Sequence, residues 1–338
     1  MPILLWLFVL ALLLASKPVW AEPYKEAIGP YSVETLLLEL EDEDRERVVP
    51  IKVYLPTDAD KPLPLVLVSH GLGGTREGLG YLGKHWASYG YLCVHMQHPG
   101  SDERVWQGLP AKDVLQAMRK AASTPQVAID RAEDVPFVLD RLERLNTREG
   151  TRLHNKIDFD RVGIAGHSFG AWSAMAAGGM TVGGRFGRSY GDARIKCIIP
   201  LSPPVAKESQ REATYRTVKV PALMMTGTLD TSVINNTTAE QRLIPYSLVP
   251  GPSNRGAAKY MINFDGADHM TFSGETGRRI RSKVSLEDNK AFHSIIRQSA
   301  TAFLDCYLLS DADARQWLDG EGFVTLVGER GEIRRETE

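Results

Sequence analysis

The chain has 338 residues, of which 43% are hydrophobic and 24% are charged. This composition is typical of a globular protein and excludes disordered and fibrous classes, and the length is sufficient for one large core. Forty Lys and Arg residues are balanced by 42 Asp and Glu residues. The near-neutral charge therefore gives no indication of nucleic acid or an anionic surface as a partner.

The N-terminus has the pattern of an export signal. Residues Ile3 to Ala15 form an unbroken apolar run, shorter than the roughly 20 residues that span a bilayer. Val19 and Ala21 provide the small residues of a cleavage site, so residues 1–21 are expected to be a signal peptide removed after Ala21. No Lys or Arg precedes the apolar run, which leaves an uncleaved anchor as the alternative. The expected location is secreted or periplasmic, with no integral membrane segment after cleavage.

Residues 22–338 are expected to form one domain, which begins with a β-hairpin. Residues 31–40 and 48–55 are rich in apolar side chains, and the acidic stretch 41–44, followed by Arg45, is expected to be its solvated tip. Further along, short continuous apolar runs alternate with helical patterns. The expected strands cover residues 65–68, 91–96, 161–165, 195–201, 222–226 and 259–264. The expected helices cover residues 77–89, 127–145, 171–177 and 289–309.

This alternation predicts an α/β fold with a mostly parallel central sheet and helices on both faces. Residues 101–124 are polar and mixed, with a short helical pattern over 113–120, and are expected to be an insertion over the sheet edge. The tail from Asp311 has little pattern. Cys93, Cys197 and Cys306 lie inside apolar runs, so we expect buried free thiols and no structural disulfide. No Cys/His cluster has zinc-ligand spacing.

The pentapeptide Gly166-His167-Ser168-Phe169-Gly170 matches the pattern G-x-S-x-G, with Gly166 and Gly170 flanking the serine. A serine on a tight strand-to-helix turn has a strained backbone, and glycine at the flanking positions removes steric clashes. The turn also places the hydroxyl at a helix N-terminus, which favours a developing oxyanion. An apolar strand before the motif and an Ala-rich helix after it provide the required context, so Ser168 is the expected nucleophile.

A serine nucleophile needs a base, and the base needs an orienting carboxylate. In this type of fold both follow the serine, the acid before the histidine, in loops after strands. Only His269 and His293 lie beyond the candidate acid Asp230, and His293 falls inside the last helix, so His269 is the expected base. Asp265 and Asp268 compete with Asp230, but they share a loop with the base, and Asp230 is preferred.

The segment His70-Gly71-Leu72-Gly73-Gly74 follows a buried strand and is well placed to supply an oxyanion donor. The backbone N–H groups of Leu72 and Phe169 are expected to point at the carbonyl oxygen of the substrate. His70 and His167 are expected to have structural roles, with His70 holding its loop by a hydrogen bond.

These motifs resemble the predicted dienelactone hydrolase and platelet-activating-factor acetylhydrolase group of α/β-hydrolases and, more distantly, bacterial lipases and polyester hydrolases. The resemblance covers about residues 30–310 and implies ester hydrolysis with Leu72 and Phe169 as oxyanion donors. Plasma-type acetylhydrolases carry the acid one strand earlier, where this chain has Leu201-Ser202-Pro203 and no carboxylate. True dienelactone hydrolases use cysteine as nucleophile. Both departures put the substrate of those families in doubt for this chain.

The expected function is that of a serine hydrolase that cleaves a small-molecule or lipid-like carboxylic ester through an acyl-enzyme, without metal or organic cofactor. Activity is expected to fall in acid, because the histidine base must be neutral. One alternative is a lipase, phospholipase or polyester hydrolase that acts at an interface through an apolar rim including Trp106 and Leu109; amide cleavage is a further possibility for the same triad. From another class, the chain could be a catalytically inactive α/β-hydrolase that serves as a binding protein. The oligomeric state is not indicated by the sequence.

Overall fold

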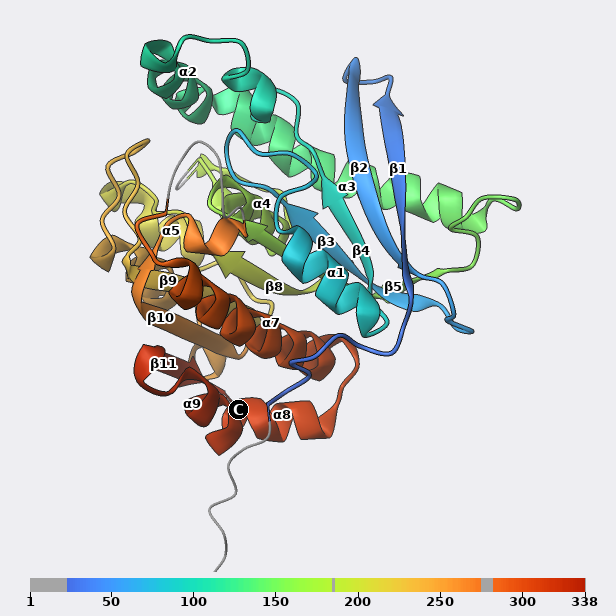
Figure 1. The fold of residues 1–338 in the computed structure, drawn as a ribbon. Coiled ribbons are helices and arrows are strands. Elements are labelled where there is room, and N and C mark those ends of the chain that lie inside the picture. The colour runs from blue at the N-terminus through green and yellow to red at the C-terminus, as the bar shows by residue number, and fades with distance from the viewer. Residues whose placement is uncertain (1–22, 184–185, 275–281, 338) are drawn as a thin grey trace, which may run out of the picture.

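The computed structural model describes residues 23–183, 186–274 and 282–337. In this part of the chain, a nine-stranded sheet has the strand order β1-β2-β4-β3-β5-β8-β9-β10-β11 (Figure 1). The strands from β4 to β10 in this order pair in parallel, whereas β1 with β2, β2 with β4 and β10 with β11 pair antiparallel. The strands are β1 (Val33–Asp42), β2 (Arg47–Pro56), β3 (Leu63–Ser69), β4 (Leu92–Met96), β5 (Ile157–His167), β8 (Ile195–Leu201), β9 (Ala222–Leu229), β10 (Lys259–Asp268) and β11 (Gly331–Glu336). A separate small hairpin pairs β6 (Thr181–Val182) with β7 (Arg188–Ser189).

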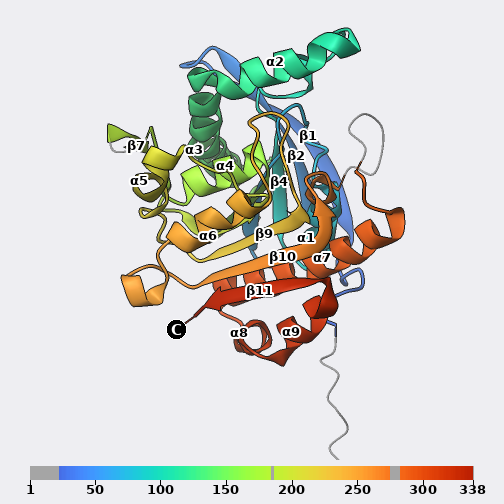
Figure 2. The same cartoon turned by 90° about the vertical axis from the view of Figure 1, so that its left-hand side faces the viewer.

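Helices cover both faces of this sheet (Figure 2). One face is covered by α1 (Gly80–Ser88) and α7 (Leu286–Leu308), with α8 (Ala312–Asp319) and α9 (Glu321–Val327) beside α7. The other face is covered by α3 (Pro125–Thr147) and α4 (Phe169–Ala177), with α5 (Arg211–Tyr215) and α6 (Ile244–Leu248) farther along. Helix α2 (Ala111–Ser123) lies at the end of the sheet and contacts α3.

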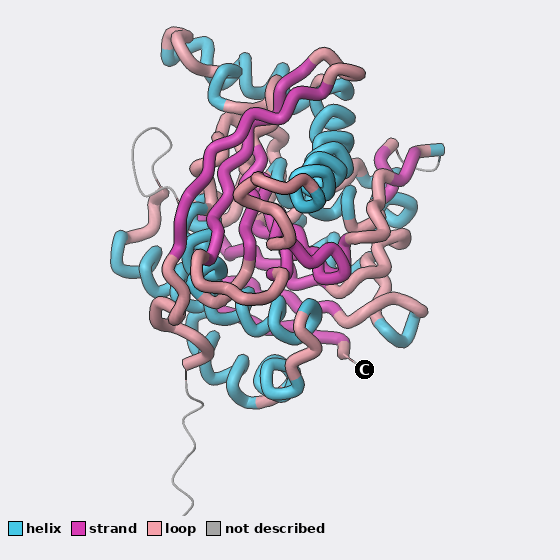
Figure 3. Tube along the Cα trace, turned by 90° about the vertical axis from the view of Figure 1, so that its right-hand side faces the viewer, coloured by secondary structure: helices cyan, strands magenta, loops and turns pink. Residues whose placement is uncertain are grey.

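Strand β3 shows why two separate cores form. Successive side chains of a strand point to opposite faces, so Leu65 and Leu67 pack with α3 and α4, while Val66 and Val68 pack with α1 and α7. All four side chains are buried. A strand of this kind is apolar at every position because neither of its faces meets water. In Figure 3 the strands form one curved layer between the two sets of helices.

The structure confirms the predicted α/β fold, the opening hairpin and the six predicted core strands. Helix α1 begins at Gly80, three residues later than expected, because a turn held by the Gly78 N–H bond to Thr75 O precedes it. The tail that showed little pattern forms α8, α9 and the edge strand β11. The expected solvated hairpin tip is found in part: Glu41, Glu43 and Asp44 are exposed, but Asp42 is buried, and Arg45 turns inward to reach Asp134.

The predicted insertion at 101–124 contains a short 3-10 helix, Glu103–Val105, and α2. Cys93, Cys197 and Cys306 are buried and unpaired. The expected signal peptide, residues 1–21, lies outside the described residues. Within the described ranges, none of the helices has the length and apolar content needed to cross a bilayer.

Candidate active site

Ser168 lies on the turn between β5 and α4 with a strained backbone, φ 56° and ψ −112°. Its N–H donates to Leu201 O of the neighbouring strand β8 at 2.9 Å, which holds the turn against the sheet. The flanking glycines are required by close backbone contact. A Cβ on Gly166 would lie 2.2 Å from Gly170 O, and a Cβ on Gly170 would lie 1.9 Å from Ser69 O. The G-x-S-x-G spacing thus follows from the geometry of the turn.

Ser168, Asp230 and His269 directly follow β5, β9 and β10, three parallel strands whose carboxyl ends meet at one edge of the sheet. The His269 Nε2 atom lies 2.9 Å from Ser168 Oγ, and His269 Nδ1 lies 2.7 Å from Asp230 Oδ1. A proton on Nδ1 that is donated to Asp230 leaves Nε2 free to accept from the serine hydroxyl. The structure therefore brings together the three side chains that sequence reasoning selected.

Asp230 is fully buried and accepts several hydrogen bonds besides the one from His269. Ser202 Oγ donates to Oδ1 at 3.0 Å, and Thr226 Oγ1 donates to Oδ2 at 2.8 Å. Arg242 Nε lies 3.3 Å from Oδ1. Burial alone raises the pKa of this carboxyl, but the hydrogen bond from His269 and the charges of His269 and Arg242 outweigh it and hold the pKa well below its usual range. The Asp230 carboxylate is consequently ionised at neutral pH.

The two competing acids are engaged elsewhere. Asp265 accepts from Thr228 Oγ1 at 3.1 Å at the exposed end of the β9–β10 pair. Asp268 Oδ1 accepts from the N–H groups of Met270 and Thr271 and so closes the turn that follows the base. Their positions agree with the preference for Asp230.

Two backbone N–H groups are available near Ser168. Leu72 follows β3, and Phe169 is the first residue of α4, at the positive end of its helix dipole. Among the described residues no hydrogen bond uses either N–H. The groups therefore suit the role of oxyanion donors that the sequence predicted for them.

His167, inside the elbow, has a structural contact. Its Nε2 donates to the carbonyl oxygen of His269 at 2.9 Å and so fixes the backbone of the residue that carries the base. Burial, and then the neighbouring His269, lower the pKa of His167 to about 3. This ring is neutral at ordinary pH, and its Nε2–H is used by the contact with the backbone.

Sequence reasoning assigned no role to Ser202 or Arg242. Ser202 directly follows β8 with φ 56°, is fully buried, and places its Oγ 2.9 Å from His269 Nδ1. Arg242 Nη1 donates to Pro203 O at 2.9 Å and to Ser202 O at 3.3 Å. Ser202 could have been found, because it belongs to Leu201-Ser202-Pro203, the segment that corresponds to the acid position in the plasma-type enzymes that this chain resembles. Arg242 could not, because it lies in a short 3-10 helix, Glu240–Leu243, with no motif.

Comparison with known proteins finds a similar family model and similar proteins. A family model described as PET hydrolase-like matches residues 121–287. The chain is 25% identical over 305 residues to the platelet-activating factor acetylhydrolase of Cavia porcellus, covering 80% of this chain and 63% of that protein. It is 25% identical over 218 residues to the cutinase est2 of Thermobifida alba, covering 64% of this chain and 56% of that protein. The chain thus spans less than two thirds of the length of these relatives. In the described ranges, no group of three or more His, Cys, Asp or Glu side chains could hold a metal ion.

Proposed function

We propose that this chain, which has the α/β-hydrolase fold and is similar to an acetylhydrolase and a cutinase, is a serine hydrolase that cleaves carboxylic esters. The observation that carries the proposal is the continuous chain of contacts from the Ser168 hydroxyl through the His269 ring to the Asp230 carboxylate, at 2.9 and 2.7 Å. These distances lie within the hydrogen-bond reach that nucleophilic catalysis requires.

In the proposed acylation step, Ser168 Oγ attacks the ester carbonyl carbon while its proton passes to His269 Nε2. The carbonyl oxygen of the tetrahedral intermediate then carries the negative charge. When the carbon–oxygen bond to the leaving alcohol breaks, His269 returns the proton to that alcohol. Water then attacks the acyl-enzyme in the same way, releases the acid and restores the Ser168 hydroxyl.

The surrounding groups stabilise the charges that arise in this sequence. Asp230 holds the His269 ring with the proton on Nδ1 and stabilises the imidazolium formed during attack. The N–H groups of Leu72 and Phe169 stabilise the oxyanion, and loss of one such donor typically costs about 10²- to 10³-fold in turnover.

Two measurements test the proposal. Ser168→Ala is expected to unfold at the same temperature as the parent protein and to lose nearly all hydrolysis of p-nitrophenyl esters, because the nucleophile is gone. A fluorophosphonate probe is expected to label the parent protein and not the variant. A chain that binds ligands without catalysis, the alternative from another class, would take up no probe and release no p-nitrophenol. An active Ser168→Ala variant would contradict the assignment.

An apolar rim supports a second candidate function, action on esters held at an interface such as a lipid aggregate or a polyester surface. Leu109, Leu115 and Val233 are 42%, 41% and 65% exposed. Leu115 lies on α2, and Val233 lies in the loop three residues beyond Asp230. The carbonyl oxygen of Val233 accepts hydrogen bonds from Arg119, which also lies on α2. This contact joins α2 to the loop that follows Asp230.

The interfacial candidate predicts that activity on a long-chain p-nitrophenyl ester rises sharply above its micellisation concentration. The double variant Leu115→Ser, Val233→Ser is expected to lose this rise and to keep its activity on soluble p-nitrophenyl acetate. Equal behaviour of parent and variant on both substrates would remove this candidate and leave the soluble ester as substrate.

Export is also part of the proposal. The apolar run of residues 3–15 and the small residues Val19 and Ala21 support a signal peptide that is removed on secretion. Tyr24 and Lys25, just beyond the proposed cleavage point, bind the buried Asp305 of α7 and so attach the new N-terminus to the core. The intact mass of the secreted protein is expected to lack residues 1–21, and a full-length mass would support the anchor instead.

A further inference from the structure

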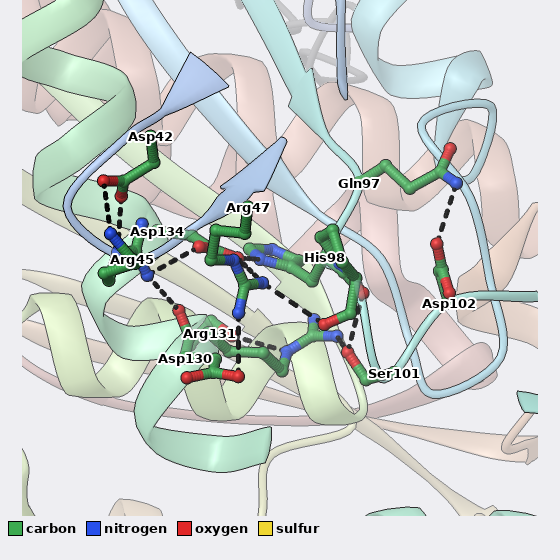
Figure 4. Close-up of polar contacts among 12 residues, drawn as sticks. Asp42, Arg45, Arg47, Gln97, His98, Ser101, Asp102, Asp130, Arg131 and Asp134 are labelled. Carbon is green, nitrogen blue, oxygen red and sulfur yellow. Dashed lines mark hydrogen bonds and ion pairs between the residues drawn. The ribbon is translucent and has the colours of Figure 1, made fainter. Parts of the chain in front are cut away.

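Arg131 of α3 is a completely buried arginine that the proposed chemistry does not use. Its guanidinium donates to His70 O at 2.5 Å and to the hydroxyls of Ser69, Ser101 and Ser173 at 2.9, 2.7 and 3.1 Å. Figure 4 shows Arg131 in a polar network that also includes other residues of α3, residues at the tip of the opening hairpin and the segment after β4. Burying a charge costs free energy unless the charge is fully hydrogen-bonded. A buried arginine with this many partners therefore indicates a specific role.

The partners of Arg131 lie on the two segments that carry the proposed oxyanion donors. Ser69 ends β3, and His70 follows it in the loop that leads to Leu72. On the other side, the guanidinium lies 4.5 Å from the centre of the Phe169 ring and bonds Ser173, one turn farther along α4. One rigid, planar side chain thus connects the loop of the first donor to the helix of the second.

The direction of the Leu72 N–H is set by His70. The His98 N–H donates to His70 Nε2 at 3.0 Å, so the proton of the neutral His70 ring lies on Nδ1, which donates to Gly71 O at 2.6 Å. The Gly71 carbonyl and the Leu72 N–H belong to one planar trans peptide and point in opposite directions. Holding the carbonyl on the His70 side therefore turns the N–H to the other side.

A second series of hydrogen bonds, from Ser69 through His98 to Asp134, supports the positions of Arg131 and His70. Ser69 Oγ, which accepts from Arg131, donates to His98 Nε2 at 2.9 Å, and His98 Nδ1 donates to Asp134 Oδ2 at 2.8 Å. Asp134 is fully buried and is neutralised by Arg45 and Arg47 of the hairpin, at 2.9 and 3.0 Å (Figure 4). Burial and the charge of Arg131 hold the pKa of His98 well below its ordinary value, so the ring stays neutral and each donor in the chain keeps its direction.

We propose that Arg131 is a positioning residue that aligns both oxyanion donors, the N–H groups of Leu72 and Phe169, by tying the loop after β3 to the first turn of α4. This inference rests on the proposed function. Its consequence is that the oxyanion site is built as one unit: loosening Arg131 displaces both donors, whereas the Ser168, His269 and Asp230 contacts stay intact. A misplacement of about 1 Å is sufficient to cost roughly 10²-fold in rate.

The test compares Arg131→Lys, which keeps the charge but loses the planar fork, with Arg194→Lys as a matched control. Arg194 also binds α3, through Asp140 and Glu143, but it is partly exposed and bonds the helix more than two turns away from residue 131. Active sites are counted by the end point of fluorophosphonate labelling, and kcat and KM are measured per active site. Each enzyme is then given an oxygen ester and the matching thionoester, whose sulfur accepts hydrogen bonds weakly and gains little from the oxyanion donors.

For Arg131→Lys we expect kcat on the oxygen ester to fall about 10- to 100-fold. KM should change by less than about 3-fold, and the preference for the oxygen ester over the thionoester should shrink by nearly the same factor as kcat. If Arg131 had a purely structural role, its replacement would lower the number of active sites, or it would lower kcat equally on the oxygen ester and the thionoester. Arg194→Lys is expected to match the parent protein in every measurement.

Ser69→Ala keeps Arg131 and removes only the hydroxyl that joins it to His98, so it tests the inference if Arg131→Lys does not fold. It is expected to show the same shift in substrate preference at about 3- to 10-fold. Unchanged kcat per active site, or an unchanged oxygen-to-sulfur preference, in these variants would overturn the inference while leaving an active, labelled parent enzyme. A parent protein that takes up no probe and hydrolyses no ester would instead refute the proposed function, and the inference with it.

Discussion

Replacing Asp230 with asparagine separates charge from orientation at the proposed acid. An asparagine Oδ1 can still accept from His269 Nδ1 and Ser202 Oγ, and its Nδ2 would face Thr226 Oγ1, which can accept as well as donate. The amide therefore fits the site with the imidazole in the same tautomer. What the variant loses is the negative charge beside the imidazolium that forms when Ser168 attacks.

The size of that loss follows from the geometry. With charge centres about 4 Å apart and an effective dielectric constant of about 20, the attraction amounts to roughly 4 kcal/mol. Because about 1.4 kcal/mol corresponds to a tenfold change in rate, kcat of Asp230→Asn is expected to fall about 10³-fold. Asp230→Ala also loses the orientation of His269 and is expected to fall further, towards the 10⁴-fold range typical of a disrupted acid.

The assay is steady-state hydrolysis of a p-nitrophenyl ester, with enzyme concentration set by active-site titration. Asp265→Asn serves as the control, because Asp265 lies in the loop of the base but its carboxylate accepts from Thr228 at an exposed position. The control should keep full activity. An Asp230→Asn variant within about fivefold of the parent, or an Asp265→Asn variant that loses as much, would refute the electrostatic role of Asp230.

Three further predictions come from other parts of the structure. Gly170→Ala should abolish ester hydrolysis and lower the unfolding temperature, because its Cβ would lie 1.9 Å from Ser69 O; an active variant with unchanged melting would contradict the described turn. The logarithm of kcat/KM should rise with a slope of one as pH increases through the acid range, because the proposed mechanism requires one group, the histidine base, to be without its second proton. Burial holds the pKa of His167 at about 3, so that ring is already neutral, and a slope of two would mean that a second essential group titrates. Asp305→Asn should lower the free energy of unfolding by about 1 to 3 kcal/mol without changing kcat, because the buried carboxylate accepts hydrogen bonds from two tyrosines and a lysine. Urea unfolding measures this free energy, and an unchanged midpoint would show that these bonds make no net contribution to stability.

The predictable part of this molecule is the part where local pattern and tertiary environment agree. Strands such as β3 and β8 are apolar at most positions because both faces are covered, so a nearly continuous run identifies them. The chain order of Ser168, Asp230 and His269 was informative because each follows a parallel strand, and such strands deliver their carboxyl ends to one edge.

Two kinds of feature were not predicted from the sequence. Strand β11 reads Gly331–Glu336 with charged residues at most positions, because an edge strand that pairs on one side with β10 needs no apolar pattern. Sequence reasoning assigned no role to Arg131, although it shares a stripe with Val135, Val138 and Leu142, which are all buried. A charged residue within an apolar stripe is the signal that could have identified it, but its partners are set only by the folded chain.

The most direct test of the central claim is a rapid-quench experiment with a p-nitrophenyl ester. Nucleophilic catalysis by Ser168 predicts a burst of about one equivalent of p-nitrophenol per active site whenever deacylation is the slower step, and an acyl group on the peptide that contains Ser168 when the burst is quenched in acid. Using a slowly hydrolysed acyl group such as a pivaloyl ester secures that condition. An acylated Ser168 is the predicted result, and turnover of this ester with the acyl group on another residue, or with none trapped, would contradict the account.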